Sequence, residues 1–165
     1  MCNYYFTKLP LLGGISLRIL IIMSSGSKVY FFYEKRGFPL ENRNVLKSFI
    51  ESVFKKEKKK LSSLNYIFCS DKRLLEINRT YLKHDYLTDI ITFDLSEGPA
   101  TTAEVYISVD RVKENARNNK VSFKNELHRV IFHGALHLCG YKDKKKEEIA
   151  VMRLKEDQYL SKYGF

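Results

Sequence analysis

The sequence predicts one small α+β domain, in which helices pack against a mixed sheet of about four strands. Size is the first observation: the chain has 165 residues, of which 44% are hydrophobic and 29% charged, as in ordinary globular domains. The second is that short runs of aromatic and β-branched residues alternate with longer stretches of helical period. The third is that the chain shows no internal repeat or low-complexity region.

Each element has its own local signal. Strands are predicted over residues 29–33, 64–69, 88–93 and 103–108, which are rich in aromatic and β-branched residues. Helices are predicted over 40–60, 71–82, 123–139 and 146–160, with a short helix or turn over 109–118. Ser70 and Ser122 are suitable N-caps, and Gly140 suits the end of the helix 123–139. The apolar residues at helical spacing are expected to face inward: Val45, Leu46, Phe49, Ile50, Val53 and Phe54 in the first helix, Leu74, Leu75 and Ile77 in the second, and Ile149, Met152 and Tyr159 in the last.

Residues 1–27 are predicted to be an extension outside the domain, which then spans residues 28–165. The apolar stretch 11–22 resembles a weak signal peptide, but Arg18 interrupts it. Met23 is therefore the preferred start of the protein. No run of ~20 apolar residues is present to span a bilayer. The three cysteines (Cys2, Cys69, Cys139) form no disulfide framework, so a cytoplasmic location is expected.

The chain is strongly basic, with a formal net charge of +10. Lysines gather at residues 55–60 and at 142–146. This excess of positive charge suits a polyanionic partner, either nucleic acid or an acidic membrane surface, and argues against a metallohydrolase that acts on a small molecule. The second lysine cluster surrounds Asp143, where positive charge would favour a phosphodiester substrate.

His133 and His137 are the residues that point most directly to chemistry. Four residues make about one helical turn, so both imidazoles leave the same face and can ligate one metal ion. Gly140 ends the helix and allows Asp143 to return with a carboxylate, which leaves a fourth position for water. Gly134 stands where zinc peptidases carry their glutamate base, so that mechanism is excluded, and the glycine permits a close approach to the helix.

The helix allows two other interpretations. The histidine pair, which lies in an apolar run, would also suit a purely structural role in packing. Cys139 is close in sequence to the pair, but it points roughly 200° away from His137 around the helix. Cys139 is therefore expected to be a small core residue.

Three segments of the chain resemble the YbeY family. Residues 133–143 are similar to its signature His-Gly-x-Leu-His-Leu-x-Gly-Tyr-Asp-His, and residues 77–93 to Leu-Asn-x-x-Tyr-Arg-x-Lys-Asp-x-Pro-Thr-Asp-Val-Leu-Ser-Phe. The segment 104–108 resembles the family's Gly-Asp-Ile-x-Ile. The resemblance extends over residues 29–160, and its first motif is the most specific.

The resemblance implies a zinc-dependent endoribonuclease that cleaves single-stranded RNA. Its substrate would be the precursor of 16S ribosomal RNA, near the 3′ end, and it would serve ribosome quality control together with the small ribosomal subunit. One Zn²⁺ per chain would be held by His133, His137 and Asp143, and other divalent ions are compatible with this set. No membrane partner and no small-molecule cofactor are expected.

The chain departs from the family pattern at the site itself. The third histidine of the signature is Asp143 here, its aspartate is Lys142, and an arginine implicated in catalysis is Leu82. Arg79, Lys83 and His84 are the nearby candidates to replace this arginine, and Lys142 and Lys144 beside Asp143 are further candidates to bind RNA. The general base is not identified by the sequence, and Lys83 and Asp89 are the weak catalytic candidates.

An alternative function is a non-catalytic RNA-binding factor of ribosome assembly, with a structural metal. The lost arginine and the lost third histidine favour it. A structural site, however, is closed by a fourth protein ligand, for which the sequence offers only Cys139 or Glu147.

Overall fold

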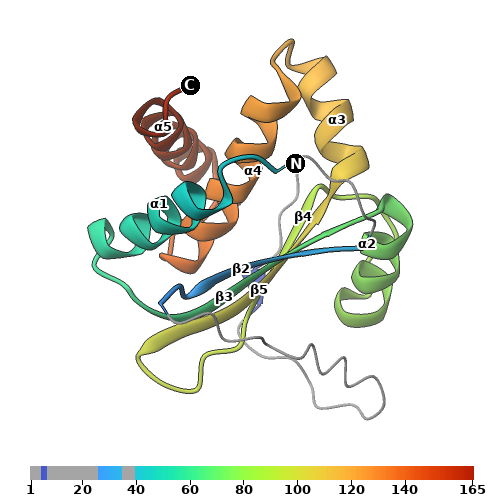
Figure 1. Cartoon of the computed structure of the whole chain (residues 1–165). Helices are drawn as coiled ribbons and strands as arrows, with labels where there is room; N and C mark the ends of the chain where they lie inside the picture. Colours follow the sequence, from blue (N-terminus) through green and yellow to red (C-terminus); the bar gives the residue numbers. More distant parts are fainter. Residues whose placement is uncertain (1–4, 7–25, 35–39) are drawn as a thin grey trace.

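A computed structural model of the chain describes residues 5–6, 26–34 and 40–165. Figure 1 shows helices gathered around one twisted sheet, as expected for an α+β domain. The predictions that concern the apolar stretch 11–22 and the start at Met23 fall outside the described residues. None of the helices in the described ranges is long and apolar enough to cross a membrane.

The sheet has five strands in the order β1-β4-β5-β3-β2. They are β1 (Tyr5–Phe6), β2 (Val29–Tyr33), β3 (Lys60–Cys69), β4 (Ile90–Asp94) and β5 (Ala100–Ser108). Strand β4 is antiparallel to β5 and the other pairs are parallel, so the sheet is mixed. The four predicted strands are confirmed, and the two-residue β1 adds a fifth at the edge beside β4. Strand β3 begins earlier than predicted, because pairing with β5 extends it through polar residues.

The helices are α1 (Arg43–Lys56), α2 (Asp71–Ile77), α3 (Val109–Asn118), α4 (Phe123–Leu138) and α5 (Lys146–Tyr163). Ser70 and Ser122 are N-caps as predicted, since their hydroxyls accept from the backbone N–H groups of Arg73 and Asn125. Gly140 follows α4 at φ +103°, a conformation that favours glycine.

The single helix predicted over 71–82 is wrong in its second half. After Ile77 the chain widens into a π-helix, η1 (Asn78–Leu82), which ends where Lys83 takes φ +59°. The inward orientation of Val45 and Ile149 is also wrong, because these side chains are 61% and 44% exposed. Val45 lies beside the buried stripe of α1, and Ile149 stands on the first turn of α5, where the helix borders a pocket instead of the core.

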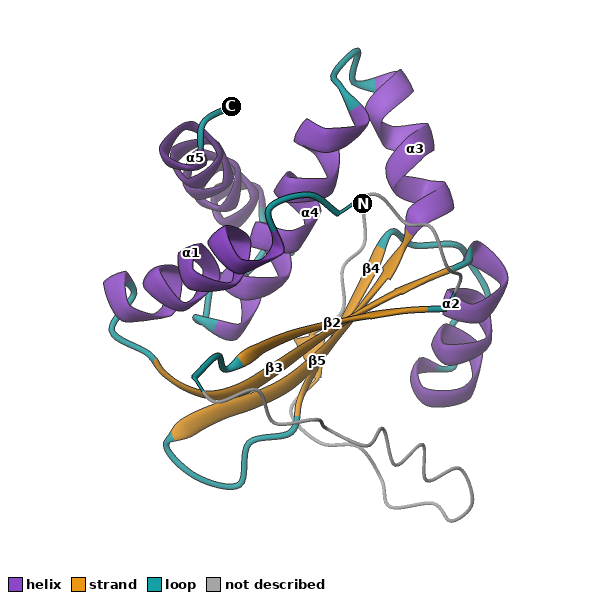
Figure 2. Ribbon diagram, in the orientation of Figure 1, coloured by secondary structure: helices purple, strands orange, loops and turns teal. Residues whose placement is uncertain are grey.

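The two faces of the sheet carry two separate apolar clusters. Val105 and Ile107 belong to the main core, whereas Tyr106 between them packs against a smaller cluster. Alternate residues of a strand point to opposite faces, so the clusters lie on opposite sides of the sheet. Figure 2 shows α1, α4 and α5 together on one side, with α2 apart from them. The main core holds buried apolar residues of α1, α4 and α5, and the smaller cluster holds buried apolar residues of α2 and η1 together with Ile91 and Phe93 of β4.

Candidate metal centre and its pocket

Helix α4 is the most deeply buried helix, and Gly134 allows it to lie directly on the sheet. A Cβ atom at Gly134 would stand 2.9 Å from Cδ1 of Ile90 and 3.0 Å from Cγ1 of Val105. The prediction that this glycine permits a close approach is confirmed, and the approaching elements are β4 and β5. The contact sets the distance of α4 from the sheet, and with it the positions of His133 and His137 on either side of the glycine.

His133 and His137 point toward the same carboxylate. Their ring centroids are 4.4 Å apart, and the Nε2 atom of each lies 3.6 Å from Oδ2 of Asp143. The turn at Gly140 brings the carboxylate back, because the N–H of Tyr141 donates to the carbonyl of Leu136 as the helix ends. One ligand atom from each of the three residues lies within 4.8 Å of the others.

The hydrogen bonds on the far side of each ring leave Nε2 as the metal-binding atom. Nδ1 of His137 lies 2.9 Å from the carbonyl oxygen of Tyr141, which can only accept, so Nδ1 carries the hydrogen. Nδ1 of His133 lies 2.7 Å from Oε1 of Glu156 and donates in the same way. In a neutral imidazole the other nitrogen, Nε2, then bears the lone pair, which in both rings faces Asp143.

These three residues fit a divalent metal ion. A separation of 3.6 Å between Nε2 and Oδ2 is longer than a hydrogen bond. It is close to the ligand–ligand edge of about 3.4 Å that bond lengths near 2.1 Å give in a tetrahedral site. Two imidazoles and one carboxylate are also a usual donor set for zinc and similar ions. His133, His137 and Asp143, named the metal group, can therefore hold a metal ion.

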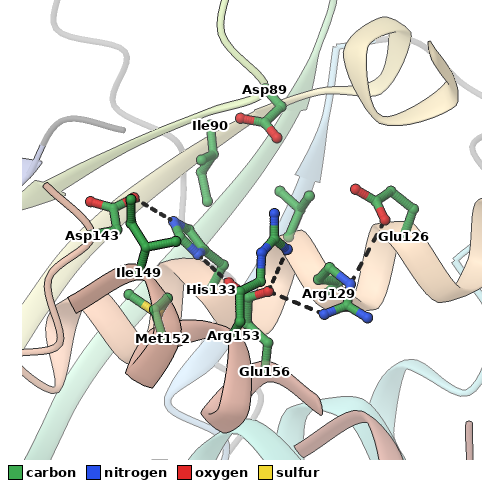
Figure 3. Close-up of a pocket in the computed structure, with 11 residues that line it drawn as sticks. Asp89, Ile90, Glu126, Arg129, His133, Asp143, Ile149, Met152, Arg153 and Glu156 are labelled. Atoms are coloured by element: carbon green, nitrogen blue, oxygen red, sulfur yellow. Dashed lines mark hydrogen bonds and ion pairs between the residues drawn. The ribbon is translucent and has the colours of Figure 1, made fainter. Parts of the chain in front are cut away.

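A pocket of about 280 Å³ opens beside the metal group. Figure 3 shows His133 and Asp143 at one end of it and Glu126 at the other, with the side chains of Arg129 and Arg153 between them. The remaining lining residues are Asp89, Ile90, Val130, Ile149, Met152 and Glu156. A site open on one side is the arrangement of catalytic metal centres, whereas structural centres are closed by a fourth ligand.

Glu156 of α5 joins the metal group to the basic residues of the pocket. Its Oε1 accepts from His133, and its Oε2 accepts from Arg129 at 3.2 Å and Arg153 at 2.8 Å. Burial acts to raise the pKa of Glu156, but the hydrogen bond from His133 and the charge of Arg153 outweigh it and hold that pKa below its ordinary value. Sequence reasoning missed Glu156, because nothing in the α5 sequence distinguishes this glutamate from solvent-facing ones.

Asp89 and Glu126 are two further carboxyl groups in the pocket. Asp89, at the start of β4, is 7% exposed, and Glu126, near the start of α4, is 1% exposed. Burial raises the pKa of both groups, and the charge of Arg153 opposes the rise in each case. The sequence singled out Asp89, and the structure places it in the wall of the pocket; Glu126 was not foreseen.

The other predicted site residues lie away from the pocket wall. Arg79 pairs with Asp85 at 2.6 Å, and the ammonium group of Lys83 donates to the carbonyl of Thr80. His84 stacks on Tyr86, with 5.3 Å between ring centroids. All belong to η1 and the loop after it, and none lines the pocket. Lys142 and Lys144 are exposed on either side of Asp143.

Position 82 and Cys139 are both parts of the core. Leu82 is 8% exposed and packs in the smaller cluster, on the sheet face opposite α4. Cys139 packs in the main core and is not a member of the metal group, as the sequence predicted. Neither residue contributes a polar group to the pocket.

The fold and this site define a class: a small α+β protein whose central helix carries a group able to bind a divalent metal ion beside an open pocket. The family model described as Endoribonuclease YbeY matches residues 33–164 of the chain. The chain therefore belongs to the YbeY family, and the resemblance noted in its sequence is confirmed.

Relatives and a solved structure agree with this assignment. Endoribonuclease YbeY of Cytophaga hutchinsonii is 49% identical, over 81% of this chain and 94% of the relative. Endoribonuclease YbeY of Flavobacterium psychrophilum is 47% identical, over 80% and 94% of the two chains. The solution structure of a Thermotoga maritima protein is similar with a TM-score of 0.58 and 29% identity, over 82% of this chain and 88% of the other.

Proposed function

We propose that this protein is a metal-dependent endoribonuclease that cleaves single-stranded RNA. The observation that carries the proposal is the group His133, His137 and Asp143, which has one side open to a pocket. Members of its family carry the name endoribonuclease. The proposed substrate is the 3′ end of the 16S ribosomal RNA precursor, acted on in the cytoplasm with the small ribosomal subunit, in processing and in ribosome quality control. The proposed ion is zinc.

The residues of the metal group and the pocket have separate proposed roles in cleavage. A divalent ion held by the metal group supplies a Lewis acid that polarises a phosphoryl oxygen and lowers the pKa of a water molecule. Glu156 holds His133 in the tautomer that presents Nε2 to the ion. The carboxylate of Asp89, in the pocket wall, is the proposed proton acceptor.

Positive charge for the phosphodiester comes from Arg129 and Arg153 in this proposal. Both guanidinium groups line the pocket and are held by Glu156, and preorganised charges of this kind stabilise a transition state that gains negative charge. They would supply positive charge that the buried Leu82, on the opposite face of the sheet, cannot supply. Arg79, Lys83, His84, Lys142 and Lys144 would bind the strand outside the pocket through its phosphates.

The test is cleavage of a 3′-extended precursor of small-subunit ribosomal RNA by the purified protein. Three samples are compared: the protein as purified, the protein stripped by a chelator and restored with zinc, and the His137→Ala variant. We expect stripping and His137→Ala to abolish cleavage and zinc to restore it in the unmutated protein only.

The matched control is His128→Phe, which changes a buried histidine of the same helix outside the metal group. His128 stacks on Tyr163, and phenylalanine keeps an aromatic ring at that position. This variant should still cleave. Tight binding of the precursor without cleavage in any divalent metal would contradict the nuclease and support an RNA-binding assembly factor with a structural metal.

A further inference from the structure

The pocket continues well beyond the metal group, along two turns of α4. His133 and Glu126 are both in its wall, with Arg129 and Val130 between them. Seven residues of helix span about 10 Å, and residues seven apart lie on the same face. That length is comparable to the distance from the phosphate to the far edge of the base in one nucleotide. A phosphate at the metal group would thus place a neighbouring base near Glu126.

Glu126 holds an acceptor atom at this far end. Its Oε1 accepts a hydrogen bond from Asn119 at 3.4 Å. Its Oε2 accepts none from any residue in the described part of the chain, and Nε of Arg129 stands 3.8 Å away, beyond hydrogen-bond distance. A buried acceptor without a hydrogen bond is costly, so such atoms in native proteins call for a ligand or an ordered water.

Asp89 adds a second carboxyl group held in a similar way. Its Oδ2 accepts from the amide of Asn115 at 3.0 Å. Asn115 and Asn119 stand one turn apart at the end of α3, so one helix fixes both carboxyl groups. Figure 3 shows both of them turned toward the interior of the pocket. The apolar side chains of Ile90, Val130 and Met152 complete the wall and suit the flat face of an aromatic ring.

We propose that the far end of this pocket binds a guanine base of the RNA strand, next to the phosphate that is cleaved. Guanine presents one carbonyl beside two N–H donor groups, N1–H and the N2 amine. Arg129 supplies the donor for O6, and the two carboxylate oxygens of Glu126 supply the acceptors for N1–H and the amine. Asp89 keeps its proposed role as proton acceptor and adds negative charge beside this donor edge. Adenine, cytosine and uracil each lack part of this pattern. The inference rests on the proposed function and deepens it by naming the nucleotide that the site selects.

Base binding in this pocket also requires a single strand. A base can enter a lined pocket only when it is unstacked and unpaired, which costs least in single-stranded RNA. The pocket therefore accounts for the strand preference that the proposed function assigns to the protein, without further contacts.

The experiment measures binding of single-stranded 2′-O-methyl pentanucleotides to the zinc-loaded protein by fluorescence anisotropy. Each oligonucleotide carries guanine, inosine, adenine, cytosine or uracil at the centre of a uridine strand. We expect guanine to bind about tenfold more tightly than adenine, cytosine or uracil. Inosine lacks the N2 amine and should fall between them, a comparison that needs no variant of the protein.

The Glu126→Gln variant tests the residue itself. The glutamine keeps the shape of the side chain but turns one acceptor into a donor, so the preference for guanine should disappear. The matched control is Glu104→Gln, because Glu104 bonds to Tyr106 on the opposite face of the sheet and does not line the pocket. Equal binding of all five oligonucleotides, or the same preference in Glu126→Gln, would overturn the proposal.

Cleavage of the corresponding RNA oligonucleotides separates this inference from the nuclease itself. Cleavage beside guanine supports both the nuclease activity and the guanine pocket. Cutting with no base preference overturns the guanine pocket and leaves the nuclease standing. Guanine-selective binding without cutting in any divalent metal supports the pocket and contradicts the nuclease.

Discussion

The two faces of the sheet use charged residues in opposite ways. On the face covered by α4 and α5, Glu126 and Glu156 are each 1% exposed and are joined to arginines and to His133. On the other face, the charges of η1 and its loop stay in solvent, and Arg79 and Asp85 pair with side chains that are 56% and 71% exposed.

This difference separates two motifs that the sequence presents as parts of one site. The segment after η1 reaches the pocket only at Asp89, where β4 begins, while Arg79 and Lys83 remain on the far side. Burying a charge requires compensating partners, and such networks recur at functional sites. We therefore place the proposed chemistry on the α4 face and the proposed phosphate contacts on the other.

Of the variants that compare the two faces, Glu156→Gln is expected to have the largest effect, a loss of metal affinity on the α4 face. The glutamine carbonyl can still accept from His133, but the amide no longer neutralises Arg129 and Arg153. The neutral amide also no longer raises the basicity of His133, and the loss of such a carboxylate partner typically costs about 10–100-fold in metal affinity. Competition with a zinc-binding dye measures this affinity. Glu76→Gln, on the opposite face, is the control, and an unchanged affinity in Glu156→Gln would contradict the role of Glu156.

Gly134→Ala should come next, because it pushes α4 away from the sheet. The new methyl group would meet side-chain atoms of Ile90 and Val105 at 2.9 and 3.0 Å. Overpacking of this kind costs about 1–3 kcal/mol in the free energy of unfolding, measured by urea denaturation. Gly98→Ala is the matched control, since nothing lies within 4 Å of its new methyl group. Equal stability of the two variants would show that the space between α4 and the sheet can accommodate an added methyl group.

Glu57→Gln tests how the α4 face is held to α1. Glu57 accepts hydrogen bonds from Tyr159 at 2.6 Å, Tyr141 at 2.8 Å and Lys155 at 2.9 Å. Burial acts to raise the pKa of Glu57, but these bonds outweigh it and hold the pKa below its ordinary value of 4.5. The ionised group therefore stabilises the fold above pH 4.5, and this stabilisation is lost as the pH falls through the lowered pKa.

We expect Glu57→Gln to lower the free energy of unfolding by about 1–2 kcal/mol at neutral pH, and by less in acid. Urea denaturation over a pH series checks this, with Glu97→Gln, an exposed position, as the control. A difference from the unmutated protein that does not shrink in acid would contradict the assigned ionisation.

The smallest effect is expected from Arg79→Ala, on the other face. An exposed ion pair contributes about 0–1 kcal/mol, so the stability should hardly change. If Arg79 contacts a phosphate, RNA binding should weaken in Arg79→Ala. The slope of log K for RNA binding against log salt concentration should fall in magnitude by about one, while kcat stays the same. The control is Arg117→Ala, at an exposed position of α3. A large loss of kcat in Arg79→Ala would break the separation of the two faces.

Much of the site follows from local sequence, because helical spacing and a following glycine are local properties. His133 and His137 share a face through their spacing alone, and Gly140 predicts the turn that returns Asp143. The predicted strands are likewise confirmed, since their aromatic and β-branched runs are local signals. The π-helical turn of η1 was missed, because nothing in the periodicity of residues 78–82 distinguishes it from an α-helix.

Only the tertiary structure decided which residues surround the metal group. Glu156 and Arg153 reach it from α5, Glu126 from the far end of α4, and Asp89 from the position just before β4, while Arg79 and Lys83 do not. Side-chain neighbours that come from separate elements depend on how those elements pack, and no spacing along one segment encodes that packing. The sequence by itself therefore determined the fold class and the three residues that could hold a metal ion, and the packing of α4 between the sheet and α5 decided the pocket.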